Sequence, residues 1–312
     1  MKTILVPEED DGARLDRALA RLTPDMGLRG RRRLCEMHLV LVNSREAAAS
    51  YKVRAGDALA LCEEPPAGET AALPRADAPR LVARTKHLAF LYKPAAMHTE
   101  SLAGKPGESL EAALEAMLGC RARLLNRLDF ATSGITAAAL SPAGEEAYRA
   151  AQDAGLTQKR YLALLEGNMP RPVLADRRLL LKNRSRVLVE LERHPDVRRH
   201  TRITPLAVME AAPVLAALGL PASGSAPESI TLAGCIILKG ARHQIRAHCA
   251  FCGFPLAGDG RYGAKTVPEG EERFFLHHGR LILPEADAFC LPPWLDALDE
   301  EAARRARLWL KA

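Results

Sequence analysis

A proline-rich stretch at residues 63–79 most constrains how this chain can fold. The stretch, EEPPAGETAALPRADAP, contains four prolines and shows little apolar periodicity. Such a composition favours an extended linker over a packed element. The 312 residues are enough for one large domain and one small domain. We therefore expect a small domain at residues 1–65, a linker at residues 66–80 and a large domain at residues 81–312.

The small domain carries most of the chain's excess positive charge. Ten Lys or Arg and five Asp or Glu lie between Ala13 and Cys62, a net charge of +5, and the whole chain has +6. A basic region of this kind is the electrostatic footprint of a module that binds a polyanion. The alternative is a solvated basic face without a partner.

Periodicity in the small domain predicts a pair of helices followed by a hairpin. Residues 13–21, ARLDRALAR, have apolar residues at helical spacing, and residues 31–37 predict a second helix. HLVLVN and DALALC alternate as strands do, with the turn RAGD before the second strand. This arrangement resembles the S4 RNA-binding domain. The resemblance implies RNA contacts from the arginines of the second helix, Arg31, Arg32 and Arg33.

Several classes of protein do not fit this sequence. No apolar run approaches the roughly 18 residues of a membrane-spanning helix, and the N-terminus lacks a secretory signal. Seven cysteines, an odd number scattered along the chain, argue against a disulfide framework. The sequence has no GxGxxG opening a βαβ unit and no GxxxxGK[ST] phosphate loop. We expect a cytoplasmic protein with reduced thiols and no cofactor.

One short pattern resembles part of a metal site. Cys249 and Cys252 form a CxxC pair, and His243 and His248 lie close to it in the sequence as conceivable further ligands. Structural zinc sites usually draw on a second ligand pair at a recognisable spacing, which this region lacks. We therefore favour two buried helical thiols and expect no metal.

The large domain contains predicted helices and strands in turn. One helix is predicted at residues 109–118, with Gly119 as its stop, and another from Ser141 to Gly155. KRYLALLEG predicts a buried strand, HQIRAHCAF a helix, and LDALDEEAARRARLWLKA an amphipathic helix at the C-terminus. Residues 211–228 are rich in Ala, Pro, Gly and Ser, and we interpret them as an insertion or a long connection.

The segment LLNRLDFATSG, residues 124–134, carries the strongest chemical signal. Asp129 follows Arg127 by two residues and precedes a tight turn, ATSG, into the apolar strand ITAAAL. A carboxylate on a turn beside a packed strand is held rigidly, and it stays ionised if a guanidinium lies near. Such a group can act as a nucleophile or a general base. The alternative is a structural turn carboxylate, because Asp, Thr and Ser all favour turns.

Four motifs in order resemble one enzyme family. NRLDFATSGI resembles the HRLDxxTSG signature of the RluA-type pseudouridine synthases, and KRYLALLEG, GARHQIRAHCAFCGFPLAGDGRYG and FFLHHGRLILP follow in that family's order. Two departures are Asn126, where the family usually has His, and KPAAMHTES, a reduced form of its KPxGxxVH segment. The resemblance implies an α+β fold with a mixed, largely antiparallel central sheet and flanking helices, preceded by the small S4-like domain.

The resemblance also implies roles for particular residues. Asp129 would be the catalytic carboxylate, Tyr161 would pack against the target base and help to remove its C5 proton, and Arg246 would keep Asp129 ionised. Arg127 would enter the RNA stack when the uridine is extruded. Three further residues would hold phosphate: Arg242, His243 and Lys93.

The expected activity is therefore the isomerisation of uridine to pseudouridine in structured RNA. By resemblance, the S4-like domain implies ribosomal RNA of the large subunit in preference to transfer RNA. The alternatives are a tRNA-directed synthase, a non-catalytic RNA-binding or ribosome-assembly protein that has kept the fold, and a carboxylate-dependent hydrolase. A hydrolase would need a second acidic group near Asp129. We expect a monomer with RNA as its partner and no membrane attachment.

Overall fold

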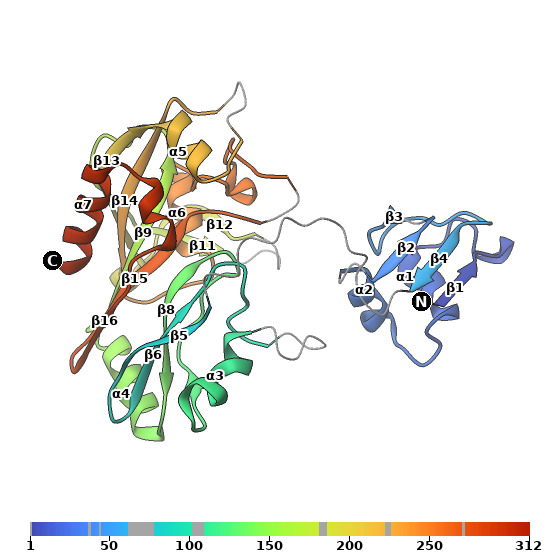
Figure 1. The fold of residues 1–312 in the computed structure, drawn as a ribbon, viewed down its shortest axis with the longest axis horizontal. Helices are drawn as coiled ribbons and strands as arrows, with labels where there is room; N and C mark the ends of the chain where they lie inside the picture. The colour runs from blue at the N-terminus through green and yellow to red at the C-terminus, as the bar shows by residue number, and fades with distance from the viewer. Residues whose placement is uncertain are drawn as a thin grey trace. The chain divides into compact units, whose positions relative to one another are not determined.

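The computed structural model divides into two compact units, Met1–Arg75 and Ala76–Ala312 (Figure 1). Most of the expected linker, residues 66–77, lies outside the part of the chain that is described. The described residues are 2–36, 39–43, 45–61, 78–101, 109–180, 186–221, 226–269 and 272–312.

The N-terminal unit combines a small antiparallel sheet with two helices. The strand order is β1 (Lys2–Leu5), β4 (Ala58–Leu61), β2 (Val40–Val42) and β3 (Arg45–Glu46). Helix α1 (Leu15–Ala18) continues into a 3-10 turn (Leu19–Arg21), and α2 (Leu28–Glu36) follows. Leu15, Leu19 and Leu59 are fully buried where the helices meet the sheet. The predicted pair of helices is present, and the second begins at Leu28 rather than at Arg31.

The C-terminal unit is built on a ten-stranded sheet. Its path is β10–β13–β14–β9–β15–β8–β6–β5, with β16 beside β15 and β7 beside β8. The described pairings are antiparallel, except that β8 and β15 run parallel. This architecture confirms the expected mixed, largely antiparallel sheet. The strands are β5 (Arg80–Arg84), β6 (Leu88–Lys93), β7 (Arg123–Leu124), β8 (Ser133–Ala139), β9 (Gln158–Glu166), β10 (Val173–Ala175), β13 (Thr201–Glu210), β14 (Ser229–Ile237), β15 (Leu276–Leu283) and β16 (Ala286–Phe289), and a separate hairpin joins β11 (Arg177–Leu180) to β12 (Leu188–Arg193).

Capping residues set the helix boundaries in this unit. Helix α3 (Leu110–Leu118) begins after Ser109, whose Oγ accepts a hydrogen bond from the helix backbone, and it ends at Gly119 in the left-handed conformation. Helix α4 (Pro142–Asp153) begins after Ser141, whose Oγ caps it in the same way. Both predictions are confirmed. Among the described residues, no helix is both long and apolar enough to cross a membrane.

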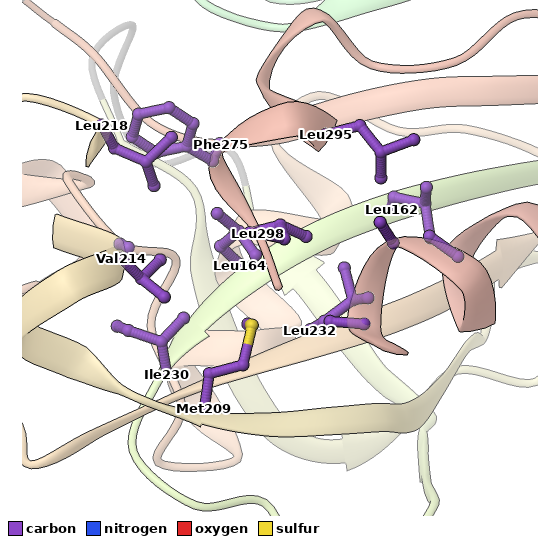
Figure 2. Close-up of a cluster of buried hydrophobic side chains, with 14 of the residues drawn as sticks. Leu162, Leu164, Met209, Val214, Leu218, Ile230, Leu232, Phe275, Leu295 and Leu298 are labelled. Atoms are coloured by element: carbon purple, nitrogen blue, oxygen red, sulfur yellow. The ribbon is translucent and has the colours of Figure 1, made fainter. Parts of the chain in front are cut away.

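The two faces of the sheet carry different cores. Leu162 and Leu164 of β9 pack on one face with α5 (Ala211–Ala217) and α7 (Glu300–Lys311), as Figure 2 shows in part. Tyr161, Ala163 and Leu165 of the same strand pack on the other face with α6 (Gln244–Phe251). Because side chains alternate along a strand, odd-numbered residues of β9 point toward α6.

Residues 211–228 are more than the insertion or connection that their composition suggests. Their first part forms α5, in which Ala211, Val214 and Leu215 are buried against the sheet. The spacing of these residues is helical, so packing on the core outweighs the weak local signal of an Ala- and Pro-rich segment. Residues 222–225 lie outside the described part of the chain.

Candidate active site

Asp129 lies in the loop between β7 and β8. Its backbone carbonyl accepts a hydrogen bond from the amide of Thr132 at 3.1 Å, which closes the predicted tight turn. Strand β8 begins at Ser133 and is buried along its whole length, so the turn is anchored to packed structure. The Asp129 side chain is 26% exposed and lines a pocket of about 390 Å³. Pockets of this size accommodate small ligands or parts of larger ones.

Arg246 of α6 binds three carboxylates although its side chain is only 1% exposed. Its Nε and Nη2 donate to the two carboxylate oxygens of Asp259 at 2.7 and 2.8 Å. Nη1 donates to Oδ2 of Asp129 at 3.1 Å, and Nη2 also donates to Oε1 of Glu272 at 2.8 Å. The ring of Phe274 lies 4.0 Å from the guanidinium carbon. The bidentate pair with Asp259 fixes the guanidinium plane, so that Nη1 is directed at Asp129.

The carboxylate partners of Arg246 keep its guanidinium protonated. Burial lowers the pKa of Arg246, but the hydrogen bond and charge of Asp259, with the charges of Asp129 and Glu272, outweigh this effect and raise the pKa above its ordinary value. The guanidinium therefore remains a permanent counter-charge for Asp129.

His243 precedes α6 and lies close to the same carboxylate. Its backbone is left-handed, with φ 51° and ψ 19°, a conformation that is uncommon outside glycine. Its Nδ1 is 3.0 Å from the hydroxyl of Tyr262, and its Nε2 is 3.9 Å from Oδ1 of Asp129. Burial lowers the pKa of His243. The charge of Asp129 raises this pKa, but the charges of Arg246 and Arg242 lower it further. At neutral pH the ring is uncharged and can offer a hydrogen bond rather than a charge.

Tyr161 lines the same pocket from β9. Its ring stacks on that of His278, with centroids 4.4 Å apart and planes 12° apart. His278 pairs with Tyr161 across β15 and β9, and its Nδ1 donates to the carbonyl of Ile135 at 2.6 Å. Burial lowers the pKa of His278 to about 3 and raises the pKa of the Tyr161 hydroxyl. The stacked pair is therefore a neutral imidazole against a protonated phenol.

Lys93 does not hold phosphate, which corrects the sequence-based expectation. Its side chain is fully buried at the end of β6, and Nζ donates to the carbonyls of Pro94, Met97 and Phe130 at 2.7, 2.8 and 3.3 Å. Burial lowers its pKa to about 7. An amine enclosed by three carbonyls cannot reach RNA. It ties the turn after β6 to the residue that follows Asp129.

Two arginines border the pocket. Arg127 is 65% exposed, and its Nη1 forms an ion pair with Glu100 at 2.8 Å. Arg242 lines the pocket from the segment between β14 and α6. Asn126, at the position of the family's usual His, accepts a hydrogen bond from the amide of Ala137 at 2.8 Å through its side-chain oxygen. This residue therefore braces the Asp129 loop against β8.

The arginines of α2 are described only in part. The side chain of Arg32 is 50% exposed, and its Nε is 2.6 Å from Oδ2 of Asp16, a fully buried carboxylate that Arg14 also holds. Arg31 is partly buried. The side chain of Arg33 lies outside the described residues. RNA contact by these arginines stays a prediction.

The sequence did not identify the groups that support Arg246 and Tyr161. Asp259 and Tyr262 belong to GDGRYG, yet nothing in that segment indicates which of its side chains reach α6. Lys159 also lines the pocket. The alternation of β9 could have indicated Lys159, because it lies two residues before Tyr161 on the same face.

Comparison with known proteins identifies the family. The family model described as RNA pseudouridylate synthase matches residues 87–251, more than half of the chain. The chain belongs to the RNA pseudouridylate synthase family. This membership confirms the resemblance carried by the four motifs, whereas the S4 resemblance of the N-terminal unit stays a prediction.

Other members of the RNA pseudouridylate synthase family resemble nearly the whole chain. Ribosomal large subunit pseudouridine synthase C of Rickettsia typhi is 25% identical over 287 residues, covering 88% of this chain and 89% of the relative. An uncharacterized RNA pseudouridine synthase of Chloroflexus aurantiacus is 28% identical over 295 residues, covering 90% of this chain and 85% of the relative. The structure of human RNA pseudouridylate synthase domain containing 1 covers 72% of this chain and 87% of its own, with a TM-score of 0.56 and 21% identity. That likeness shows a shared fold.

Proposed function

We propose that this synthase isomerises uridine to pseudouridine in ribosomal RNA of the large subunit, with Asp129 as its catalytic carboxylate. The observation that carries the proposal is the contact of Asp129 with Arg246 in a pocket that Tyr161 also lines. A partly exposed carboxylate with a permanent counter-charge is suited to act as a nucleophile or a base. The Rickettsia relative, named for the large ribosomal subunit, supports this class of RNA.

The reaction breaks the bond between uracil N1 and ribose C1′, turns the base and joins C5 to C1′, without redox change. Asp129 either attacks covalently or removes the C2′ proton to give a glycal intermediate, and both routes use an ionised carboxylate. Tyr161 packs against the base. Because burial raises its pKa, its phenol would have to transfer its own proton before it could accept the one from C5.

The target nucleotide must leave its stack to reach this pocket. Arg127 is exposed at the pocket and can take the place of the extruded base, after release from Glu100. Arg242 and His243 offer donors to the adjoining backbone. The basic N-terminal unit, as an S4-like module, would add phosphate contacts to the ribosomal RNA, and the protein would act in the cytoplasm.

Replacement of the carboxylate tests the proposal. We expect Asp129→Asn to abolish tritium release from RNA labelled at uridine C5 while RNA affinity stays within about twofold, because affinity rests mainly on phosphate contacts. Asp296→Asn is the matched control, since Asp296 is 95% exposed and does not line the pocket. Comparable release by the Asp129 variant would reject Asp129 as the catalytic carboxylate. Absence of release by the wild-type protein would instead favour a non-catalytic RNA-binding protein.

Separation of the labelled RNA by size tests the target. Release confined to the large-subunit ribosomal fraction supports the proposal, and release from the transfer RNA fraction contradicts it.

A further inference from the structure

Lys159 places a buried amine in the pocket. It lies on β9 two residues before Tyr161, so both side chains point to the same face of the sheet. Its side chain is buried, with 4% relative exposure. The pocket that it lines is the one that contains Asp129 and Tyr161.

The amine of Lys159 has no hydrogen-bond acceptor and no carboxylate partner within the described part of the chain. The centroid of the Tyr148 ring is 5.8 Å from the amine, and the charge of Lys159 helps to lower the pKa of His278. Buried polar groups are normally satisfied, and a buried charge without a partner carries a large desolvation penalty. Lys93 shows how a buried amine is usually satisfied, because it donates to three backbone carbonyls. Lys159 therefore has donors left over for a ligand.

The amine is also in the right protonation state to donate. Burial lowers the pKa of Lys159 to about 8, so the ammonium form still predominates at neutral pH. An ammonium group has three donors and no acceptor. The ligand atom that suits this ammonium group is a hydrogen-bond acceptor that gains negative charge during the reaction.

Uracil offers such atoms during the reaction. When the bond between N1 and C1′ breaks, its electron pair stays on the base and spreads from N1 onto the carbonyl oxygens O2 and O4. When C5 then bonds to C1′, C5 loses a proton and N1 gains one. Charge on the carbonyl oxygens is therefore greatest between the two steps, when the base is detached from the sugar.

We propose that Lys159 donates a hydrogen bond to a carbonyl oxygen of the extruded uracil and stabilises the detached base. The inference rests on the proposed function and deepens it, because it gives the same pocket a contact for the leaving group. Lys159 keeps its protons throughout. Asp129 supplies the carboxylate that attacks covalently or removes the C2′ proton. A donor in place before the reaction is most effective where charge develops, since it need not reorganise.

Single-turnover kinetics test the contact. Full-length wild-type protein, Lys159→Met and Lys86→Met are compared on total RNA, labelled with tritium at uridine C5, from cells that lack this gene. We expect Lys159→Met to release tritium about 100-fold more slowly, with RNA affinity unchanged. Its melting temperature should not fall, because Met removes a buried charge without a partner among the described residues. Lys86 is exposed in the turn between β5 and β6, and its variant should match wild type.

Chemical rescue separates substrate contact from a structural role. Lys159→Ala leaves space for a small cation, so we expect millimolar methylammonium to restore part of its rate and to leave Asp129→Asn inactive. The proposal is overturned if Lys159→Met keeps the wild-type rate, if its loss of rate follows a loss of RNA affinity or folding, or if methylammonium restores nothing. Absence of release by the wild-type protein from every RNA fraction would instead refute the proposed function, and this inference with it.

Discussion

Lys93 and Lys159 are both buried, and their surroundings give them different roles. The amine of Lys93 is bound by three backbone carbonyls, one of them from the residue after Asp129. Lys159 has no such acceptor in the described part of the chain and lines the pocket. Burial lowers the pKa of both, to about 7 and about 8. A lysine enclosed by carbonyls orders the backbone, whereas one with spare donors can bind a ligand.

Lys93 should make the stability of the protein depend on pH. Its pKa falls from 10.5 to about 7 on folding, so between these values the unfolded chain binds a proton that the folded chain does not. The wild-type free energy of unfolding should therefore rise with pH relative to that of Lys93→Met. The slope should reach at most about 1.4 kcal/mol per pH unit. Chemical denaturation of both proteins between about pH 7 and 10 measures the difference.

Lys86→Met is the control for this measurement, because Lys86 is exposed. Its difference from wild type should stay constant across the same pH range. A constant difference for Lys93→Met as well would mean that the fold does not disfavour the charged form of Lys93.

At the scale of secondary structure, the site depends on the close approach of β8 and β15. Gly134 of β8 pairs with His278 of β15 in the parallel ladder, and its φ is 119°. A Cβ added to Gly134 would lie 2.3 Å from the carbonyl oxygen of His278 and 2.6 Å from its amide nitrogen. β8 follows the Asp129 turn, and His278 supports Tyr161. The glycine of the TSG motif therefore lets the two sides of the pocket come together.

Gly134→Ala should separate these strands. We expect a loss of about 3 kcal/mol in the free energy of unfolding, from the steric clash and the strained backbone together, and slower isomerisation. Gly119→Ala is the matched control: its φ is also positive, at 66°, but an added Cβ meets nothing within 4 Å. That variant should lose only about 1 kcal/mol. Equal losses in urea denaturation would mean that the contact with His278 does not limit residue size at Gly134.

At the scale of the whole molecule, we expect the N-terminal unit to contribute RNA affinity and the C-terminal unit to carry the chemistry. Removal of residues 1–65 should weaken binding to bulk RNA and flatten its dependence on salt. If Arg31, Arg32 and Arg33 of α2 contact phosphate, the slope of log K against log salt should become shallower by about two to three. The C-terminal unit has its own core, so its melting transition should persist.

Binding titrations at several salt concentrations measure this slope. The control replaces Arg304, Arg305 and Arg307 of α7 by Ala, which removes three positive charges from a helix that does not line the pocket. Its salt slope should stay close to that of wild type. Equal RNA affinity of the truncated and full-length proteins at every salt concentration would contradict a role of the N-terminal unit in RNA binding.

Local interactions explain how much of the fold could be predicted. The boundaries of α3 and α4 were predictable because capping by Ser109 and Ser141 acts over three residues. Strand β9 was predictable because its apolar run is buried. The family could be recognised because its motifs are short, and Asp129 lies within one of them. A capping hydroxyl or a turn carboxylate acts on its chain neighbours, so the sequence alone determined these features.

Tertiary structure decided which distant groups meet. Arg246 and Asp129 are 117 positions apart, and the carboxylates of Asp259 and Glu272 reach the same guanidinium from a third segment. In the sequence, Lys93 and Lys159 are both lysines that lie close to apolar runs, LAFLY and YLALL. Only packing encloses one in carbonyls and leaves the other with spare donors in the pocket. Burial and partnership depend on strands brought together from separate parts of the chain, and no local pattern records them.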